Sequence, residues 1–247
     1  MEKIDKMLAR YGKASDRKDN WISLWQDCYD LAFPQRTGFY DNAAGQSNTD
    51  EIYDSSPVQA TAEFASRMQA GLTPSFAKWF ELQAGSEIPE EQASEVNRHL
   101  EDVSNYVWET LQNSNMNQEL HEAYFDLAIG TGTMTIEEGL HPEDQPVEFT
   151  TLPQPQVVLD HGPFGYIDAT YRARQLRLRE ITVIWPKAKI HGDMQTQGER
   201  DPEHMFTIIE CVHRDWESRG TERHVYSVIS KEPKHILLEG EYVGDGA

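Results

Sequence analysis

Cys211, His213 and Asp215 stand at alternate positions of the segment CVHRD, and they are the residue types of a nucleophile, a base and an orienting acid. On a β-strand, alternate side chains share one face, so all three would point the same way. Neighbours on that face are about 6.5–7 Å apart, whereas a nucleophile and its base need about 2.6–3.2 Å. The spacing argues against a Cys-His-Asp relay, and we predict no catalytic residue.

Two glycines in IGTGTM, at residues 129–134, could cradle a phosphate. A phosphate cradle follows a strand and opens a helix, whereas here a helical pattern ends and a strand pattern begins. We therefore expect a helix C-cap followed by a strand. The nine histidines form no HExxH motif, and the clusters at His121 and His141 offer too few converging ligands for zinc. The sequence thus predicts neither a cofactor nor a metal site.

The total charge restricts the classes of partner. The 247 residues carry a net charge of −20, which repels a polyphosphate unless basic residues are segregated, so we do not expect a sequence-reading DNA-binding protein. The two cysteines, Cys28 and Cys211, are too few for a disulfide framework, and a reducing compartment is expected. No uninterrupted apolar run exceeds three residues, so we expect no membrane span.

Two runs of charge stand out against this background. Residues 87–109 contain seven acids and one base, whereas residues 172–189 contain six bases and one acid. The bases include Arg172, Arg174, Arg177 and Arg179, which are our candidates for contacts with a neighbouring subunit, DNA or another partner. Three interpretations stay open: both runs are solvated faces, they meet across a subunit boundary, or the arginines bind DNA phosphates or a packaging partner.

The elements that position these residues follow from periodicity. Apolar residues at helical spacing predict a helix that Gly12 ends, a second that Pro34 ends, and a polar loop over residues 35–50. A third helix is predicted to begin with Ser56 as the N-cap of a capping box and to end with Gly71 in the left-handed conformation.

A fourth helix should begin after Pro89, with an apolar stripe made by Val96, Leu100, Val103, Val107 and Leu111, and a fifth should end near Gly130. Beyond residue 130 the period changes to two, and strand-like segments alternate with turns. A short helix is expected in LREITVIWP, and residues 191–203 are expected to form a surface loop. Helices followed by strands indicate an α+β fold with a mainly antiparallel β region, divided into a helical part at 1–130 and a β-rich part at 131–247.

The order and spacing of several segments resemble one known family. These are Trp25, Tyr29 and Pro34; Ile52-Tyr53-Asp54-Ser55-Ser56; a helix of small residues; Gly71-Leu72-Thr73-Pro74; Trp79-Phe80-Glu81-Leu82; and Phe125 through Gly130-Thr-Gly-Thr. The set resembles the N-terminal region of the head-to-tail connector, or portal, proteins of short-tailed bacteriophages.

The resemblance implies a ring of identical subunits, usually twelve, at one capsid vertex, through which double-stranded DNA passes without specific binding during packaging and ejection. It also implies contacts with the major capsid and scaffolding proteins, the terminase motor and the tail adaptor, no enzymatic activity, no membrane partner, and a place in a virion assembled in the host cytoplasm. The acidic charge fits such a channel, because phosphates would not adhere to it.

Family members are considerably longer, and the sequence offers no candidate for their channel stem, clip or crown. The resemblance therefore implies that the chain corresponds to the wing region. Two alternatives stay open, namely another virion assembly, head-completion or adaptor protein, and a cytosolic enzyme whose carboxylate site the sequence hides.

Overall fold

The computed structural model of the chain describes residues 3–34, 53–139, 145–162, 165–215 and 223–243. The predicted loop at 35–50 lies outside these residues. The chain divides into two compact units: unit 1 consists of Met1–Ser23 and Gln156–Ala247, and unit 2 consists of Leu24–Pro155. These compact units group Met1–Ser23 with the β-rich segment, and the hairpin of residues 133–152 with the helices. The two expected parts at 1–130 and 131–247 stay a prediction.

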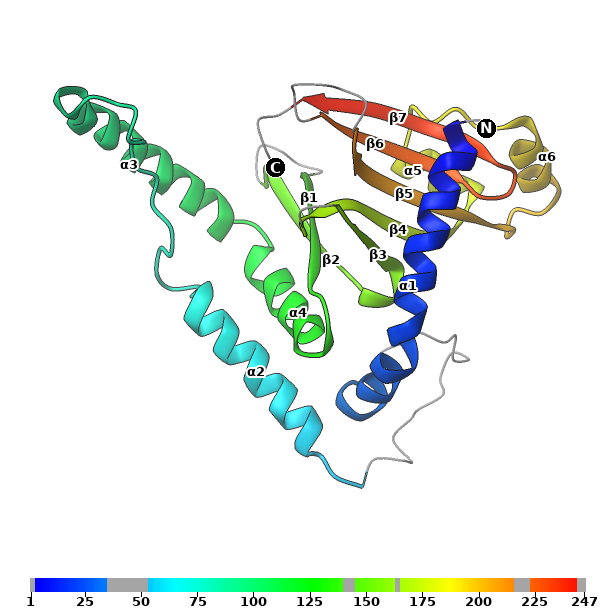
Figure 1. The fold of residues 1–247 in the computed structure, drawn as a ribbon, viewed down its shortest axis with the longest axis horizontal. Helices are drawn as coiled ribbons and strands as arrows, with labels where there is room; N and C mark the ends of the chain where they lie inside the picture. Colours follow the sequence, from blue (N-terminus) through cyan, green and yellow to red (C-terminus); the bar gives the residue numbers. More distant parts are fainter. Residues whose placement is uncertain (1–2, 35–52, 140–144, 163–164, 216–222, 244–247) are drawn as a thin grey trace. The chain divides into compact units, whose positions relative to one another are not determined.

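Unit 1 is built on a five-stranded antiparallel sheet in the order β3-β4-β5-β6-β7. Its strands are β3 (Val157–His161), β4 (Ile167–Arg177), β5 (Met205–Arg214), β6 (Arg223–Ser230) and β7 (His235–Val243). The first part of α1 (Lys3–Ala32) covers one face of the sheet, and the connection from β4 to β5 carries α5 (Leu178–Ile184) and α6 (Gly192–Arg200) (Figure 1).

Alternation along β5 explains why both faces of this sheet are covered. Ile209 and Cys211 point into a core with Ile4, Met7 and Ala14 of α1. Phe206 and Ile208 point the other way, into a second core with Ile181 of α5, Trp185 and Met194 of α6. Since successive side chains of a strand face opposite sides, one apolar strand serves two cores.

Unit 2 contains the end of α1, the helices α2 (Ser56–Leu72), α3 (Glu90–Gln112) and α4 (Met116–Ile129), the hairpin of β1 (Thr133–Glu138) and β2 (Val147–Leu152), and the short helix η2 (Gln154–Gln156) at its border. Tyr29 of α1 and Phe33, the residue after this helix, pack in one cluster with Phe125 of α4, and the Tyr29 hydroxyl donates to Asp126 Oδ1 at 2.7 Å. On α2, the fully buried Ala65 lies among the small residues of the helix, which allows close packing against α4.

An extended segment, residues 78–84, runs along α3 in the opposite direction. The backbone N–H of Leu82 donates to Ser104 Oγ at 3.0 Å, and that of Ala84 donates to Asn97 Oδ1 at 2.8 Å. The rings of Phe80 and Trp108 meet edge to face, with centroids 6.3 Å apart. Side chains of α3 therefore satisfy a backbone that belongs to no sheet, and we call residues 78–84 the strap.

The α+β class with a mainly antiparallel β region is confirmed, but several local predictions are wrong. Gly12 does not end a helix, since α1 continues to Ala32. Gly71 lies inside α2, whose C-cap is Thr73, and it does not adopt a positive φ. The expected surface loop at 191–203 contains α6, which the fully buried Met194 anchors to the second core of unit 1.

The start of α2 also differs in detail from the prediction. Its N-cap is Ser55 and not Ser56, and no side chain caps the helix there. Instead, Asp54 Oδ1 accepts from both the backbone N–H and the hydroxyl of Ser56, at 2.9 and 2.8 Å. A carboxylate before the first turn thus takes the place of the predicted capping box.

Candidate assembly surfaces

Charge is divided unequally between the two units. Unit 2 contains 4 basic residues (Lys and Arg) and 23 acidic residues (Asp and Glu), which gives a net charge of −19. Unit 1 contains 18 basic and 19 acidic residues, which gives a net charge of −1. On α3, five carboxylates are exposed and lie in no ion pair within the described part of the chain: Glu91, Glu95, Glu101, Asp102 and Glu109. The predicted acidic run is thus one face of a unit that is acidic throughout.

Large apolar side chains are exposed on the same unit. Phe76 is 86% exposed and Tyr106 69%, while Leu72, Trp79 and Leu82 are between 41 and 55% exposed. These residues lie at the end of α2, on the turn after it, on the strap and on α3. Apolar side chains gathered on a few adjacent elements are typical of a surface that another molecule covers.

The four candidate arginines lie on the opposite side of the unit 1 sheet from α1, or at its border with α5. Arg174 forms an ion pair with Glu210 of the neighbouring strand, and its guanidinium lies 5.4 Å from the centre of the Trp185 ring. Arg172 Nε donates to Gln156 Oε1 at 3.3 Å. Both side chains are therefore engaged within their own unit.

Arg177 and Arg179 position α5. Arg177 is the N-cap of this helix, and its backbone N–H and guanidinium both donate to Glu180, at 2.7 and 2.9 Å. Glu203 binds both arginines, at 2.6 Å from Arg177 and 2.8 Å from Arg179. The backbone hydrogen bond from Arg177 lowers the pKa of Glu180, and the hydrogen bond from Arg179 lowers that of Glu203. Arg179, whose side chain is 58% exposed, is the best placed of the four to reach a partner as well.

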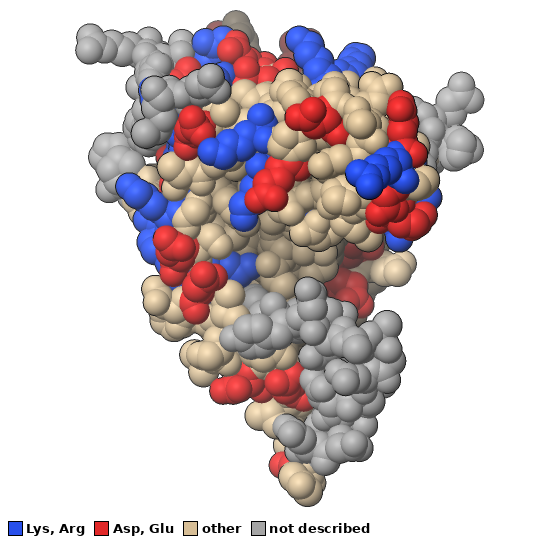
Figure 2. Space-filling view, turned by 90° about the vertical axis from the view of Figure 1, so that its right-hand side faces the viewer, with Lys and Arg blue, Asp and Glu red and all other residues tan. Residues whose placement is uncertain are grey.

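Figure 2 views the molecule from the side on which α6 lies in Figure 1, and basic side chains there stand beside acidic ones. The pairing of Arg174, Arg177 and Arg179 with Glu210, Glu180 and Glu203 follows the same pattern. Contact of these arginines with a neighbouring subunit or with DNA stays a prediction.

A further ionic cluster in unit 1 fixes α1 to the sheet, and it was not predicted from the sequence. Arg10 Nε donates to Asp160 Oδ2 at 2.7 Å, Arg10 also binds Asp168, and Arg17 binds Asp160. Burial alone would raise the pKa of Asp160, but hydrogen bonds and attraction from the two arginines outweigh burial and lower it. A usable signal was present, since bases recur at helical spacing along α1: Lys3, Lys6, Arg10, Lys13 and Arg17.

The Cys211–His213 pair requires a correction. Cys211 Sγ and His213 Nδ1 lie 3.3 Å apart, so the strand spacing does not keep these side chains out of hydrogen-bond reach. Side chains that lean along a strand toward each other bring their ends closer together than their Cα atoms are. Burial nevertheless raises the pKa of the Cys211 thiol to about 12, and the residue is 1% exposed. A buried neutral thiol is a poor nucleophile, so the pair is structural.

The IGTGTM segment is a helix end, as predicted. Gly130 is the C-cap of α4, and β1 begins at Thr133. A Cβ at Gly132 would lie 2.5 Å from the carbonyl oxygen of Ala123, and one at Gly130 would meet the Gln154 side chain at 2.1 Å. These glycines thus permit close packing, which explains them without a phosphate.

No group of three or more potential metal ligands occurs among the residues that the structure describes. His141, Glu143 and Asp144 lie outside those residues. His121 uses its Nδ1 in a hydrogen bond of 2.9 Å with Gln69 Oε1, and its ring packs edge to face on Phe125. This histidine therefore links α4 to α2.

Comparison with known proteins identifies the family. A family model described as "Bacteriophage head to tail connecting protein" matches residues 5–245. The chain therefore belongs to the family of bacteriophage head-to-tail connecting proteins. The "Probable portal protein" of Bordetella phage BPP-1 is 24% identical to it over 236 residues, which make up 92% of this chain and 42% of that protein. The chain thus spans about two fifths of the length of this relative.

The family defines a structural role in the phage particle. Head-to-tail connecting proteins are structural components of phage particles, and the chain belongs to this family. Among the described residues, every helix is too short or too polar to cross a bilayer.

Proposed function

We propose that the chain is a portal subunit that assembles into a ring, with twelve copies as the expected number, at one vertex of the capsid. Double-stranded DNA would pass through the ring during packaging and ejection. The surface of unit 2 carries the proposal, since it combines a net charge of −19 with exposed apolar side chains in a chain of the connector family.

The charge suits a passage for DNA for a physical reason. Proteins that hold DNA do so with lysines and arginines that release counterions from the phosphates. Unit 2 offers four such residues against 23 acids, so it would repel the duplex and let it slide. We therefore assign the acidic unit to the DNA passage, and no enzymatic activity to the chain.

The proposed partners follow from the same role. They are other copies of the chain, the major capsid and scaffolding proteins, the terminase motor and the tail adaptor, in a virion assembled in the host cytoplasm. For Arg172, Arg174, Arg177 and Arg179, contact with one of these partners or with DNA is part of the proposal, and the exposure of Arg179 makes it the first to test.

Native mass spectrometry and negative-stain electron microscopy of the purified 247-residue chain test the ring. The expected result is one closed ring with a single subunit number near twelve. Ring yield should not depend on DNA, because the contacts are between protein copies. A chain that stays monomeric up to about 100 μM, a concentration at which even weak specific interfaces form, contradicts the proposal.

A further inference from the structure

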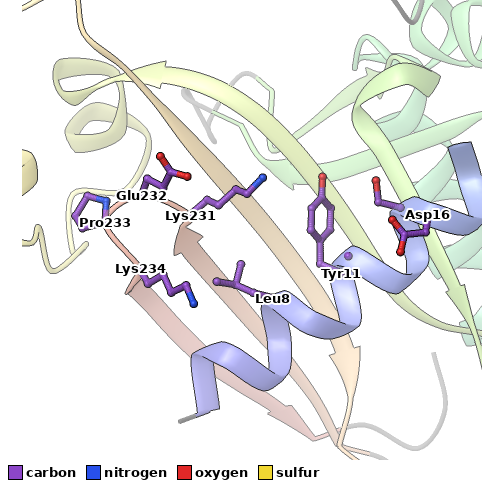
Figure 3. A pocket seen from close by; sticks show the side chains of 9 residues that line it. Leu8, Tyr11, Asp16, Lys231, Glu232, Pro233 and Lys234 are labelled. Atoms are coloured by element: carbon purple, nitrogen blue, oxygen red, sulfur yellow. The ribbon is translucent and has the colours of Figure 1, made fainter. Parts of the chain in front are cut away.

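Unit 1 has a pocket between α1 and the turn that joins β6 to β7. The cavity measures about 520 Å³ and is lined by Leu8, Tyr11, Gly12, Ser15, Asp16, Lys231, Glu232, Pro233 and Lys234. Figure 3 shows that one face of α1 forms one wall and the four-residue turn forms the other. The ionic cluster around Arg10 is not part of this lining, so the pocket is a separate feature of the helix.

The lining defines the chemistry of an occupant. Leu8, the Tyr11 ring and Pro233 offer an apolar floor, and Lys231 and Lys234 stand at its rim. Lys234 donates to Asp5 at 2.9 Å, whereas the ammonium group of Lys231 lies in no ion pair among the described residues. An aromatic ring fits such a site, because it buries against the apolar side chains and accepts cation–π contacts from lysines.

Unit 2 offers such a ring. Phe76 is 86% exposed in the turn between α2 and the strap. It has no polar atom to hydrate, unlike Tyr106, and within the described part of unit 2 it lacks a ring partner such as Trp79 finds in Phe80 at 5.1 Å. Of the exposed side chains on this part of unit 2, Phe76 gains the most from burial in another molecule.

The charge division indicates which surfaces of two copies can meet. Contact between two copies of unit 2 would bring together net charges of −19 each, whereas contact of unit 2 with unit 1 meets a net charge of −1. The repulsion therefore favours a contact of unlike surfaces. A contact of unlike surfaces is heterologous, and a heterologous contact closes into a ring when its rotation allows.

We propose that Phe76 of one copy inserts into the Leu8–Tyr11–Pro233 pocket of the next copy. This inference rests on the proposed ring of subunits and specifies a contact between neighbouring subunits. Removing the Phe76 side chain from the pocket should lower the affinity between neighbouring copies roughly tenfold to a hundredfold, as expected for the burial of one large apolar side chain.

Gly12 provides the sharpest test. It lines the pocket within α1, and a Cβ there would meet no atom within 4 Å. Gly12→Leu should therefore fill the pocket and also favour the helix, so it should abolish ring formation while the melting temperature stays equal or rises. Gly12→Ala is the matched control, since it favours the helix equally but leaves most of the cavity open, and it should still assemble.

Phe76→Ala tests the other side of the contact. It should fold normally, because the ring is exposed, and it should require a tenfold to hundredfold higher concentration to assemble, as measured by sedimentation velocity. Tyr166→Ala removes a ring that is 80% exposed on unit 1 and should assemble like the unmodified chain. As a direct test of proximity, a chain with Ser15→Cys and a chain with Phe76→Cys, both with Cys28→Ser, should form a disulfide with each other when mixed.

The outcomes separate the two proposals. Rings of normal yield from Gly12→Leu and Phe76→Ala, together with no disulfide between the mixed chains, overturn the pocket contact and leave the ring proposal standing. A monomeric unmodified chain overturns both.

Discussion

At the residue scale, the sheet face beneath α1 holds ionisable groups whose protonation is set by burial. Burial raises the pKa of Tyr171, which lies in the core beside Arg10, above its usual range, and raises that of the Cys211 thiol to about 12. Burial also lowers the pKa of His213. All three groups are therefore neutral at pH 7, and an ionic cluster of Arg10, Arg17 and their two aspartates lies beside them.

His213 leads to a prediction about pH. Its folded pKa is below the unfolded value of 6.5, so the unfolded chain binds the proton more readily. The stability of unit 1 should therefore be complete above pH 6.5 and fall as the pH drops from 6.5 towards the folded pKa. Urea unfolding at about pH 7.5, 6.5 and 5.5 measures this loss. His213→Gln should reduce the change across this range, and an equal pH dependence in both chains would show that His213 is not its source.

The ionic cluster shows the limit of prediction at this scale. The bases on α1 were visible in the sequence, but their partners Asp160 and Asp168 lie more than 140 residues away. The structure brings them together because Ile4, Met7 and Ala14 fix α1 on the sheet with its basic edge toward β3 and β4. Spacing identifies the stripe, and only the tertiary packing identifies what it binds.

At the element scale, strands and helices with a strong period were predicted from sequence, and glycines were misread. The strand segments after residue 130, α3 with its apolar stripe, and α5 all occur where expected. Gly12 and Gly71 were interpreted as helix ends, but the apolar residues on both sides belong to one continuous helix in each case. The helix around each glycine outweighs its cost, about 0.5–1 kcal/mol relative to alanine.

α6 was missed for the opposite reason. Its nine residues contain one large apolar side chain, Met194, so no helical period could be detected. Met194 is fully buried among Phe206, Ile208 and Val228, and His191 accepts a hydrogen bond from the Asp193 N–H at the N-cap. A single anchor and a cap define this helix, and neither gives a repeating pattern in the sequence.

Gly71 gives the prediction at this scale. The sequence pattern placed it in the left-handed conformation, where alanine would be strained and would destabilise the protein. In the structure it is a helical residue, and a Cβ added there would meet no atom within 4 Å, so Gly71→Ala should stabilise α2 by about 0.5–1 kcal/mol. Thermal unfolding monitored by circular dichroism gives the sign directly. A fall in the melting temperature would instead support the sequence-based prediction that α2 ends at Gly71 in the left-handed conformation.

At the scale of the whole molecule, the net charge of −20 can be counted from the sequence, but its division between the two compact units cannot. The family assignment and the acidic run on α3 were both available from the sequence. The near neutrality of unit 1 was not, because it depends on which segments fold together: residues 1–23, with six bases and four acids, join residues 156–247, with 12 bases and 15 acids. The surface of an acidic unit and the pocket on a near-neutral unit become visible only when the chain is divided as the fold divides it.

Unit 1 also presents two different faces, which the proposed ring would need because each subunit in it would have neighbours on two sides. The pocket lies on the α1 side of the sheet, and the arginines lie toward α5 on the other side. Any assembly effect of the arginines must be separated from their role in folding, because Arg174 and Glu210 are paired with less than 20% of either side chain exposed.

Two charge reversals make that separation. Arg174→Glu should destabilise unit 1 by about 2–4 kcal/mol, because it places a second carboxylate beside the poorly exposed Glu210.

Arg179→Glu should change stability little, since its ion pair with Glu203 is exposed at both ends. If Arg179 contacts an acidic surface of a neighbouring copy, Arg179→Glu should lower the ring yield at low salt, and Glu101→Lys with Asp102→Lys on α3 should restore it. Equal ring yields for the unmodified chain and Arg179→Glu at every salt concentration would confine the arginines to holding α5 on its own sheet.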